Sequence, residues 1–449
     1  MDNALVLLAA WMPQQRWYAT KTGLPRLRAI ASWDLPGDGV LVRTHLIADD
    51  GSTPPTLYQV PTVARPTDTV GEEAVAIGEL GPGMTLVDGT HDPAFTGPLL
   101  RLITAGGTAT GPGMGATGRA ADAPPPIGTG YLARVLSGEQ SNTSIVYRTD
   151  GDGAPVIVKI FRQLHAGLNP DVELTTALST DGSPYVARAV GSVEGEWPDA
   201  AGADDAARGS LVFAQEFLPG VEDAWRVALR AAVAGEDFTA RARALGEATA
   251  DVHTRLAELF PVRTTDAAAR RETARRWQRR LAAAVAEVPQ LAERAPAIEA
   301  VYARAADDAW PALQRVHGDY HLGQVILVPG RGWVLLDFEG EPLRPMSERL
   351  EPDLAVRDVA GMLRSFDYVA GSLQLDDPHR AATGPLAWAR ASRDAFLAGY
   401  EEAAGIPVSG ALLDALELDK AVYEALYEAR NRPTWLPIPL GAIARLTAG

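Results

Sequence analysis

Hydrophobic and polar positions follow two different patterns along this chain, and the change falls near residue 220. Before that point, short apolar runs between turn residues predict β-strands, as in GVLVRTHLIADDGS (39–52) and TLYQVPTVA (56–64). After it, longer amphipathic segments predict helices. In ARALGEATADVHTRLAELF (242–260), the residues expected on the buried face are Leu245, Val252, Leu256 and Leu259.

The stretch just before the helical part predicts a hairpin, a helix and a strand in turn. NTSIVYRTD (142–150) and APVIVKIF (154–161) flank an Asp-Gly turn. LNPDVELTTAL (168–178) predicts a helix with Asn169 as its cap, and SLVFAQEFLPG (210–220) predicts a strand. Strands followed by a mostly helical half are typical of an α+β, two-lobed fold.

The segment AGGTATGPGMGATGRAADAPPPIGTG (105–130) is rich in Gly, Ala and Pro. Because this composition buries little apolar surface, we expect a linker or surface loop and a domain boundary near residue 125. The alternative is a long loop inside one domain. The predicted parts are an N-terminal subdomain with its linker (1–125), a β-rich lobe (126–220) and an α-helical lobe (221–449).

The first residues predict an amphipathic helix that packs on the rest of the chain. The apolar stretch from Ala4 to Met12 is too short to span a bilayer, and no basic region precedes it as in a signal peptide. The helix leads into WMPQQRWY (11–18), whose large apolar groups need a partner surface. We therefore expect no membrane association.

Composition narrows the possible partners and the compartment. The 449 residues carry a net charge of −16, which argues against nonspecific nucleic-acid binding, because that needs a basic face. The chain has no cysteine, which excludes disulfides, thiolate metal sites and a Cys nucleophile. A chain without cysteine fits the reducing cytoplasm, where we expect this protein to act.

Polar residues gather at the edges of two apolar runs in VHGDYHLGQVILVPGRGWVLLDFEG (316–340). Gln324 follows Asp319 by five residues, the separation at which protein kinases place a catalytic Asp and a metal-binding Asn. A hydrophobic run then leads to Asp337, as in the kinase DFG segment. One carboxylate would deprotonate an acceptor hydroxyl, while another and an amide oxygen would hold Mg²⁺ against the phosphates of ATP. The pattern predicts a kinase-type phosphotransferase.

An upstream lysine supports the same chemistry. Lys159 lies in the buried-strand pattern VIVKIF (156–161), where a lysine is costly without an anionic partner. Kinases use such a lysine to hold the α- and β-phosphates and pair it with a helix Glu, for which Glu173 is the candidate. The loop SGEQSNTSIVY (137–147) stands where a phosphate-covering loop belongs, with candidate donors on Ser141, Asn142, Thr143 and Ser144.

Alternatives remain open for the whole set and for single residues. A binding protein that kept this architecture and lost catalysis is disfavoured, because Lys159, Asp319 and Asp337 are all present. Glu339 either binds a second metal ion or caps the turn, and we favour the metal. His321 either lines the acceptor site or only packs.

Motifs along nearly the whole chain resemble the actinobacterial maltokinase family, a relative of the aminoglycoside phosphotransferases. In order, they are QQRWYA (14–19), GEQSNTS (138–144), VKIFR (158–162), GLNPDVEL (167–174), HGDYHLGQV (317–325), DFEGEP (337–342), RDVAGMLRSFDY (357–368) and LDKAVYEALYEARNRPTWLPIPL (418–440). The resemblance implies a protein-kinase-like fold with an N-terminal cap, a nucleotide-binding lobe and a helical lobe. It also implies ATP and Mg²⁺, and we expect the protein to be a monomer.

Roles follow from the resemblance residue by residue. It implies that Asp319 is the catalytic base and that Gln324 and Asp337 are metal ligands. It places Lys159 on the phosphates of ATP, and it places Glu216-Phe217 near the adenine hinge.

The sequence leaves more than one acceptor open. Maltokinases phosphorylate maltose at the anomeric hydroxyl, and two stretches here differ from their usual pattern, PDLAV (352–356) and GAIARL (441–446). A sister group of actinobacterial proteins resembles glucosamine kinases. We therefore favour glucosamine, phosphorylated at its 6-hydroxyl, over maltose, with an aminoglycoside as a third acceptor.

The predicted acceptor side is acidic, which suits the ammonium of glucosamine because carboxylates give it charge-assisted hydrogen bonds. The alternative is that these carboxylates form a solvated helix face or pair with Lys420, Arg430 and Arg432. A Trp beside carboxylates is common in sugar pockets, and a core Trp is the alternative. The residues expected to contact the acceptor are Asp319, His321, Asp419, Tyr423, Glu424, Glu428 and Trp435.

Overall fold

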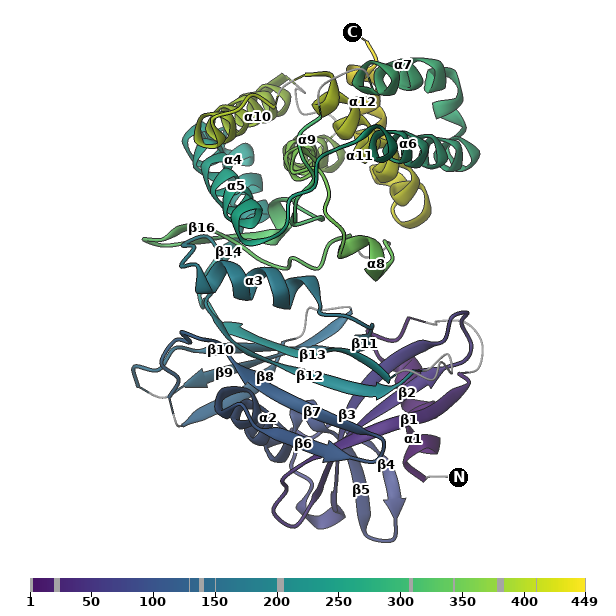
Figure 1. Ribbon diagram of the computed structural model, residues 1–449, viewed down its shortest axis with the longest axis vertical. Coiled ribbons are helices and arrows are strands. Elements are labelled where there is room, and N and C mark those ends of the chain that lie inside the picture. The colour runs from purple at the N-terminus through teal and green to yellow at the C-terminus, as the bar shows by residue number, and fades with distance from the viewer. Residues whose placement is uncertain are drawn as a thin grey trace. The chain divides into compact units, whose positions relative to one another are not determined.

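The computed structural model divides into two compact units, Met1–Thr180 with Ala187–Pro219 and Asp181–Val186 with Gly220–Gly449. We call them the β-rich unit and the helical unit, after the elements that dominate each in Figure 1. The structure describes residues 3–19, 25–128, 130–136, 141–149, 151–199, 206–306, 310–341, 344–377, 383–408 and 410–448.

One antiparallel sheet of the β-rich unit comes from the N-terminal residues. Its strand order is β1-β2-β3-β5-β4, and β11 pairs with β3. Helix α1 (Asn3–Trp11) packs against β4 and β1. The strands are β1 (Leu27–Leu35), β2 (Leu41–Asp49), β3 (Thr56–Pro66), β4 (Ala76–Gly81), β5 (Met84–Asp88) and β11 (Gln163–Leu164).

The partner surface expected for the first helix is present on this sheet. The Arg162 guanidinium lies 4.8 Å from the centre of the Trp17 ring, and the Tyr18 hydroxyl donates to Asp49. These contacts confirm that the N-terminal aromatic residues pack onto the chain. The buried cluster consists of Leu8, Trp11, Met12, Trp17, Tyr18, Ile47, Tyr58 and Val60.

The second sheet has seven strands within the described residues, in the order β6-β7-β12-β13-β10-β9-β8. Tyr147 lies opposite Val156, which confirms the predicted hairpin. Asn169 caps helix α3 (Pro170–Thr180), because its Oδ1 accepts from the Asp171 N–H at 2.9 Å. The strands are β6 (Thr108–Gly111), β7 (Met114–Ala120), β8 (Tyr131–Val135), β9 (Asn142–Thr149), β10 (Val156–Phe161), β12 (Ala189–Pro198) and β13 (Ala206–Glu216).

The prediction of a linker or loop at 105–130 is wrong for much of that segment, because β6 and β7 lie within it. Strand β7 pairs with β12 from Gly115 opposite Glu196 to Ala120 opposite Gly191. The glycines there have a packing role. A Cβ on Gly118 would stand 1.9 Å from the carbonyl oxygen of Leu102 in helix α2 (Pro93–Ala105). Small residues thus let a helix lie directly against the strand, a role that composition alone does not reveal.

The two sheets share one hydrophobic core. The cluster includes Trp33 and Val63 from the first sheet, Leu99 from α2, and Ile145 and Val158 from the second sheet. The compact unit therefore continues through residue 125, and the division next to the helical part falls between Pro219 and Gly220. The finer separation of a cap from a nucleotide lobe stays a prediction.

Helices dominate the second unit, as the sequence predicts. Helix α5 (Thr239–Leu259) buries Leu245, Val252 and Leu256, but Leu259 is 39% exposed, so the predicted apolar face is wrong in the last turn. No described helix is long and apolar enough to cross a membrane. The remaining elements are β14 (Glu222–Asp223), α4 (Ala224–Ala234), α6 (Ala267–Glu287), α7 (Ala295–Ala306), β15 (Val325–Val328), β16 (Gly332–Leu335), α8 (Met346–Arg349), α9 (Val356–Asp376), α10 (Thr383–Ala404), α11 (Ala411–Asn431) and α12 (Pro437–Leu446).

Replacing Gly118 by Ala should strongly destabilise the β-rich unit, because the new methyl group would overlap a backbone oxygen that cannot rotate away. We expect a loss of about 3 kcal/mol in the free energy of unfolding, measured by urea denaturation. Gly115→Ala on the same strand is the matched control, since its Cβ would lie 3.9 Å from its nearest described neighbour, the carbonyl oxygen of Ala109. Equal stability of the two variants would contradict the packing of α2 on β7.

Candidate active site

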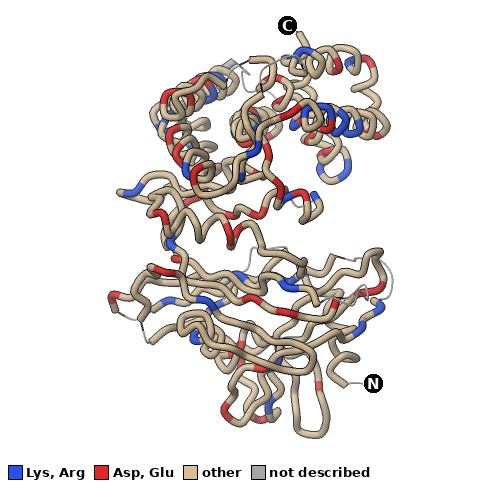
Figure 2. The backbone as a smooth tube through the Cα atoms, in the orientation of Figure 1, with Lys and Arg blue, Asp and Glu red and all other residues tan. Residues whose placement is uncertain are grey.

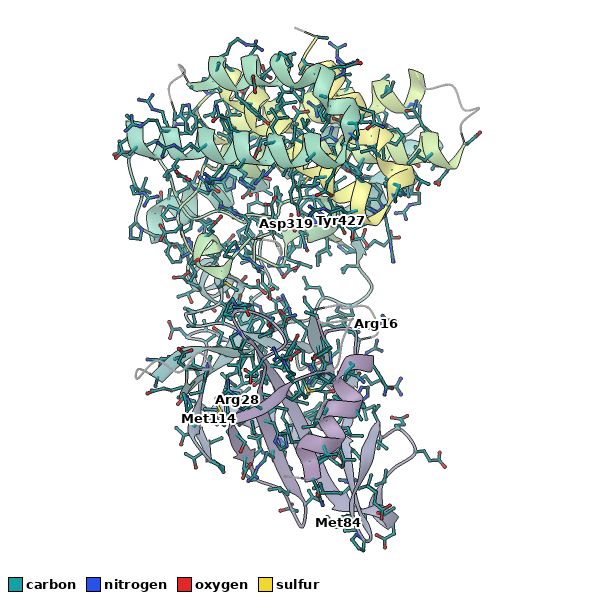
Figure 3. The ribbon with its side chains drawn as sticks, turned by 90° about the vertical axis from the view of Figure 1, so that its right-hand side faces the viewer. Arg16, Arg28, Met84, Met114, Asp319 and Tyr427 are labelled. Carbon is teal, nitrogen blue, oxygen red and sulfur yellow. The ribbon has the colours of Figure 1, made fainter. Side chains whose placement is uncertain are left out.

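The segment that carries Asp319 is fixed by its own neighbours. Gly318 has φ of +85°, a left-handed conformation that favours glycine. The N–H of Asp319 points to Nδ1 of His317 at 3.4 Å, and Nε2 of His317 donates to the Leu336 carbonyl at 2.8 Å. His317 is thus a structural residue that ties this segment to the one leading to Asp337. Figure 3 labels Asp319 in the helical unit.

Asp358 in α9 anchors the same segment. Its Oδ2 accepts from the His317 N–H at 2.8 Å, and its Oδ1 accepts from the Gly318 N–H at 3.0 Å. Nε2 of His253 lies 3.1 Å from Oδ2, and the Tyr400 hydroxyl lies 2.9 Å from Nδ1 of His253. Burial alone would raise the pKa of Asp358, but His253, His317 and the Gly318 N–H outweigh it and lower that pKa.

The sequence reasoning assigned Asp358 no role. The signal that could have found it is a carboxylate inside the apolar helical run VRDVAGML (356–363), since a buried Asp needs specific partners.

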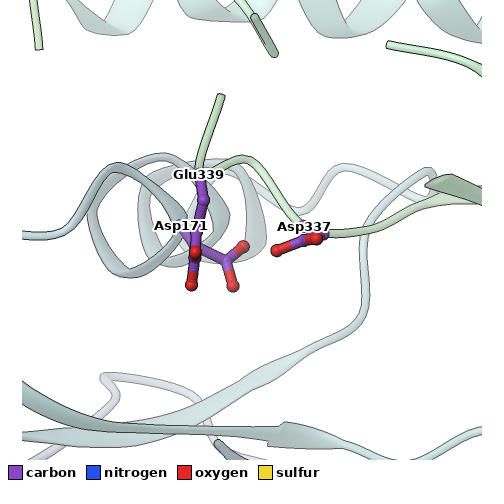
Figure 4. A group of neighbouring side chains, drawn as sticks. All are labelled: Asp171, Asp337 and Glu339. Carbon is purple, nitrogen blue, oxygen red and sulfur yellow. The ribbon is translucent and has the colours of Figure 1, made fainter. Parts of the chain in front are cut away.

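Asp337 and Glu339 follow strand β16, and one carboxylate oxygen of each lies within 4.8 Å of the other (Figure 4). Asp337 has φ of 64°, a conformation that is costly for most side chains and recurs at functional sites. Nε2 of Gln324 donates to Oδ2 of Asp337 at 3.1 Å. Two carboxylates and an amide oxygen are ligands that Mg²⁺ prefers, so the chemistry of this set fits the ion. Asp171, also drawn in Figure 4, belongs to the β-rich unit.

A lysine and a histidine flank the carboxylate of Asp319. Nζ of Lys420 in α11 lies 3.4 Å from Oδ1, and Nε2 of His321 lies 4.0 Å from Oδ2. Nδ1 of His321 accepts from the Gly323 N–H at 3.0 Å. Burial lowers the pKa of His321, Asp319 opposes this effect and Lys420 adds to it. The acceptor-lining role of His321 stays a prediction.

The carboxylates expected to face the acceptor are paired with arginines. Asp419 accepts from Arg280 at 2.5 Å, and Glu424 accepts from Arg364 at 2.7 Å through Oε2. Burial raises the pKa of Asp419 and of Glu424, and the arginines oppose this effect. Arg280 comes from α6, along which basic residues gather (Figure 2).

Glu428 is also paired, because Oε1 accepts from Arg432 at 2.6 Å and from the Tyr368 hydroxyl at 3.1 Å. The pairing that the sequence left open as an alternative is therefore what the structure shows for these carboxylates. Arg432 was one of the expected partners, whereas Arg280 and Arg364 were not, because they come from distant helices.

Aromatic rings lie next to these ion pairs. Trp435 stacks on Tyr368 with ring centres 6.2 Å apart, and the Arg432 guanidinium lies 4.6 Å from the Trp435 ring centre. Tyr423 and Tyr427 stack at 6.5 Å. Trp435 is half-buried, so it is not a core residue, and its contact with a sugar stays a prediction.

Lys159 in the β-rich unit has the anionic partner that its position requires. Its Nζ bonds to Oδ2 of Asp171 at 2.9 Å, and both side chains are largely buried. Asp171 lies in the first turn of α3, two residues before Glu173. The bond observed thus comes from Asp171, and a role for Glu173 at the lysine stays a prediction.

The phosphate-covering loop is shorter than predicted. Asn142, Thr143 and Ser144 belong to strand β9, and the Thr143 hydroxyl accepts from Nε of Arg162 at 2.8 Å. Ser144 is buried in the strand, and Ser141 directly precedes it. Residues 137–140 lie outside the described residues.

The predicted hinge lies at the end of β13. The Phe217 N–H donates to the Pro155 carbonyl at 2.8 Å, and Glu216 pairs with Arg188 at 3.3 Å. These bonds fix the strand end, while adenine binding there stays a prediction.

A β-rich unit with a buried lysine–carboxylate pair, and a helical unit with an anchored Asp and a second Asp after a strand, define the kinase-like class of phosphotransferases. Family comparison agrees. Residues 133–396 match the phosphotransferase enzyme family and residues 11–92 match the maltokinase N-terminal cap domain. The chain belongs to the phosphotransferase enzyme family, and its α+β kinase-like fold with an N-terminal cap is as predicted.

Relatives and solved structures point in the same direction. A glucosamine kinase from Streptacidiphilus jiangxiensis is 32% identical over 50% of this chain and 54% of its own length. One from Mycolicibacterium smegmatis is 29% identical over 70% of this chain and 79% of its own. This chain is also similar to a solved glucosamine kinase in complex with glucosamine, ADP and inorganic phosphate. The alignment covers 98% of each chain, and its TM-score of 0.68 at 24% identity shows a shared fold.

Asp358→Asn should lower the free energy of unfolding and make that free energy less dependent on pH. Because the folded-state pKa of Asp358 is lowered, its stabilisation is present above the ordinary Asp value of about 3.9 and is lost as pH falls through the lower folded value. We expect the free energy of unfolding of the variant to be about 3 kcal/mol lower near neutral pH. Between about pH 5 and 2, the free energy of unfolding, measured with urea, should then fall less steeply than in the wild type.

Asp394→Asn, at an exposed position in α10, is the control and should keep the wild-type pH dependence. An unchanged slope in Asp358→Asn would show that this carboxylate is not the anchor.

Proposed function

We propose that this chain is an ATP-dependent sugar kinase that transfers the γ-phosphate of ATP to the 6-hydroxyl of glucosamine. The observation that supports glucosamine as the acceptor is that two sequence relatives are glucosamine kinases. The phosphoryl chemistry is supported by the position of Asp319 beside its anchored loop. We further propose that the protein acts as a monomer in the cytoplasm.

Asp319 is the base in this proposal. Its carboxylate takes the proton of the sugar hydroxyl as that oxygen forms a bond to the γ-phosphorus. The bond from the γ-phosphorus to the bridging oxygen breaks in the same transfer, and ADP leaves. The ammonium of Lys159, held by Asp171, contacts the nucleotide phosphates.

Asp337, Gln324 and Glu339 would hold Mg²⁺ through carboxylate and amide oxygens. When bound, the ion would neutralise negative charge on the phosphates during transfer.

The acceptor face combines charge and aromatic surface. Within the described residues, the hydrogen bonds from Arg364 to Glu424 both reach Oε2. The sugar ammonium would then donate to Oε1. Trp435 would contact the apolar side of the sugar, and His321 would stand near the reacting hydroxyl. Tyr423 would add a second ring. Asp419 and Glu428, buried in their pairs with Arg280 and Arg432, would hold neighbouring side chains in place rather than contact the sugar.

Maltose phosphorylated at its anomeric hydroxyl is the second candidate reaction. The observation in its favour is the match of residues 11–92 to the maltokinase cap domain.

An acceptor panel should separate these candidates. We expect ATP-dependent ADP release with glucosamine and little with N-acetylglucosamine, because acetylation removes the ammonium that the carboxylates recognise. Glucose, maltose and kanamycin complete the panel. Turnover with maltose alone would replace glucosamine by maltose, and turnover only with kanamycin would indicate an aminoglycoside kinase.

Asp319→Asn should lower kcat by about 10²- to 10⁴-fold, because the amide cannot take the acceptor proton. ATP should still bind to the variant, as measured by calorimetry, since Asp319 is not among the residues proposed to hold the nucleotide. Near-normal turnover would exclude Asp319 as the base.

A further inference from the structure

Lys420 combines burial, charge and contact with the proposed base. Its Nζ lies 3.4 Å from Oδ1 of Asp319 and 2.7 Å from Oε1 of Glu341. The Tyr423 ring centre lies 5.2 Å from the same nitrogen. These contacts hold an otherwise flexible side chain in one place, and only 19% of it is exposed.

Glu341 is itself clamped, which makes the lysine position rigid. Its Oε2 accepts from Arg357 at 2.9 Å, while its Oε1 accepts from Lys420. Both oxygens of this carboxylate are thus bonded, and only 3% of the Glu341 side chain is exposed.

Lys420 is the cation that links Glu341 to Asp319. Arg357, the other cation on Glu341, lies 3.9 Å from Asp353 instead. Burial would lower the pKa of Lys420, but Glu341 and Asp319 outweigh it and raise that pKa. Lys420 is therefore a permanent cation beside the base.

We propose that Lys420 is a positioning residue that holds Oδ1 of Asp319, so that Oδ2 is presented to the acceptor hydroxyl. This inference rests on the proposed function, because it takes Asp319 as the base. His321 stands on the Oδ2 side at 4.0 Å, where the acceptor hydroxyl would approach. Lys420 exchanges no proton in the reaction; the acceptor proton passes to Asp319.

The obvious alternative is that Lys420 only completes a buried ion pair with Glu341. The two roles differ in what Lys420 does when Asp319 can no longer act as a base. A positioning residue loses its effect on turnover in that background, whereas a structural residue keeps it.

The test measures kcat and KM for Lys420→Met, Lys420→Arg, Asp319→Asn and the double variant Asp319→Asn/Lys420→Met. We expect Lys420→Met to lower kcat by about 100-fold, the usual cost of a misplaced reacting group, with KM for ATP and acceptor little changed. Lys420→Arg should recover part of the loss because it keeps the charge. The double variant should be no slower than Asp319→Asn alone.

Arg430→Met is the matched control, since Arg430 lies on the same helix, is exposed and pairs with Glu287. It should keep wild-type kcat. Additive losses in the double variant, or wild-type kcat in Lys420→Met, would overturn the positioning role.

Folding of each variant is checked by urea denaturation. If Lys420→Met does not fold, Lys420→Met/Glu341→Gln takes its place, because it removes the buried pair as a unit. A wild type inactive on glucosamine but active on another member of the panel would refute only the proposed acceptor, and the cycle would be run with the active one. A wild type inactive on every acceptor would overturn both proposals.

Discussion

The carboxylate of Asp358 accepts hydrogen bonds from the main-chain N–H groups of His317 and Gly318, and the rest of the site depends on that arrangement. Side-chain contacts alone would leave the backbone before Asp319 free to turn, since Gly318 restricts it so little. With both N–H groups bound, the direction in which Asp319 leaves the main chain is set. His317 extends the same constraint to the Leu336 carbonyl and so to the segment that carries Asp337.

In the helical unit, buried carboxylates are paired with arginines. Carboxylates of α11 are paired with arginines from α6, from α9 and from the residue that follows α11, so the acidic surface expected from the sequence is largely neutralised. Burying ions in this way stabilises little in net terms, because desolvation offsets most of the attraction. It does fix the orientation of each side chain, which is what a binding surface for a small polar molecule requires.

Sequence patterns can indicate much of the candidate site because the residues expected to do the chemistry lie close together in the chain. Asp319, Gln324 and Asp337 lie within one short segment, and Lys159 stands out in a buried strand. Partners that come from distant elements could not be predicted, since no local pattern specifies that Asp171 meets Lys159 or that Arg280 meets Asp419. The linker prediction failed for a different reason, because glycine signals both chain flexibility and close packing. The close approach of Gly118 to α2 shows that this glycine serves close packing and not chain flexibility.

The β-rich unit is interrupted in sequence, because residues Asp181–Val186 belong to the helical unit and the chain returns at Ala187. Strands β12 and β13 come after that excursion, yet β12 is the strand to which β7 bonds, and β13 is the neighbour of β10. During synthesis, β7 must therefore keep one edge unpaired until residues near 191 have left the ribosome. The sheet closes through pairings that are distant in sequence, which form slowly. An N-terminal fragment that stops before β13 would hence contain most of the residues of this unit and still expose the strands that its core requires.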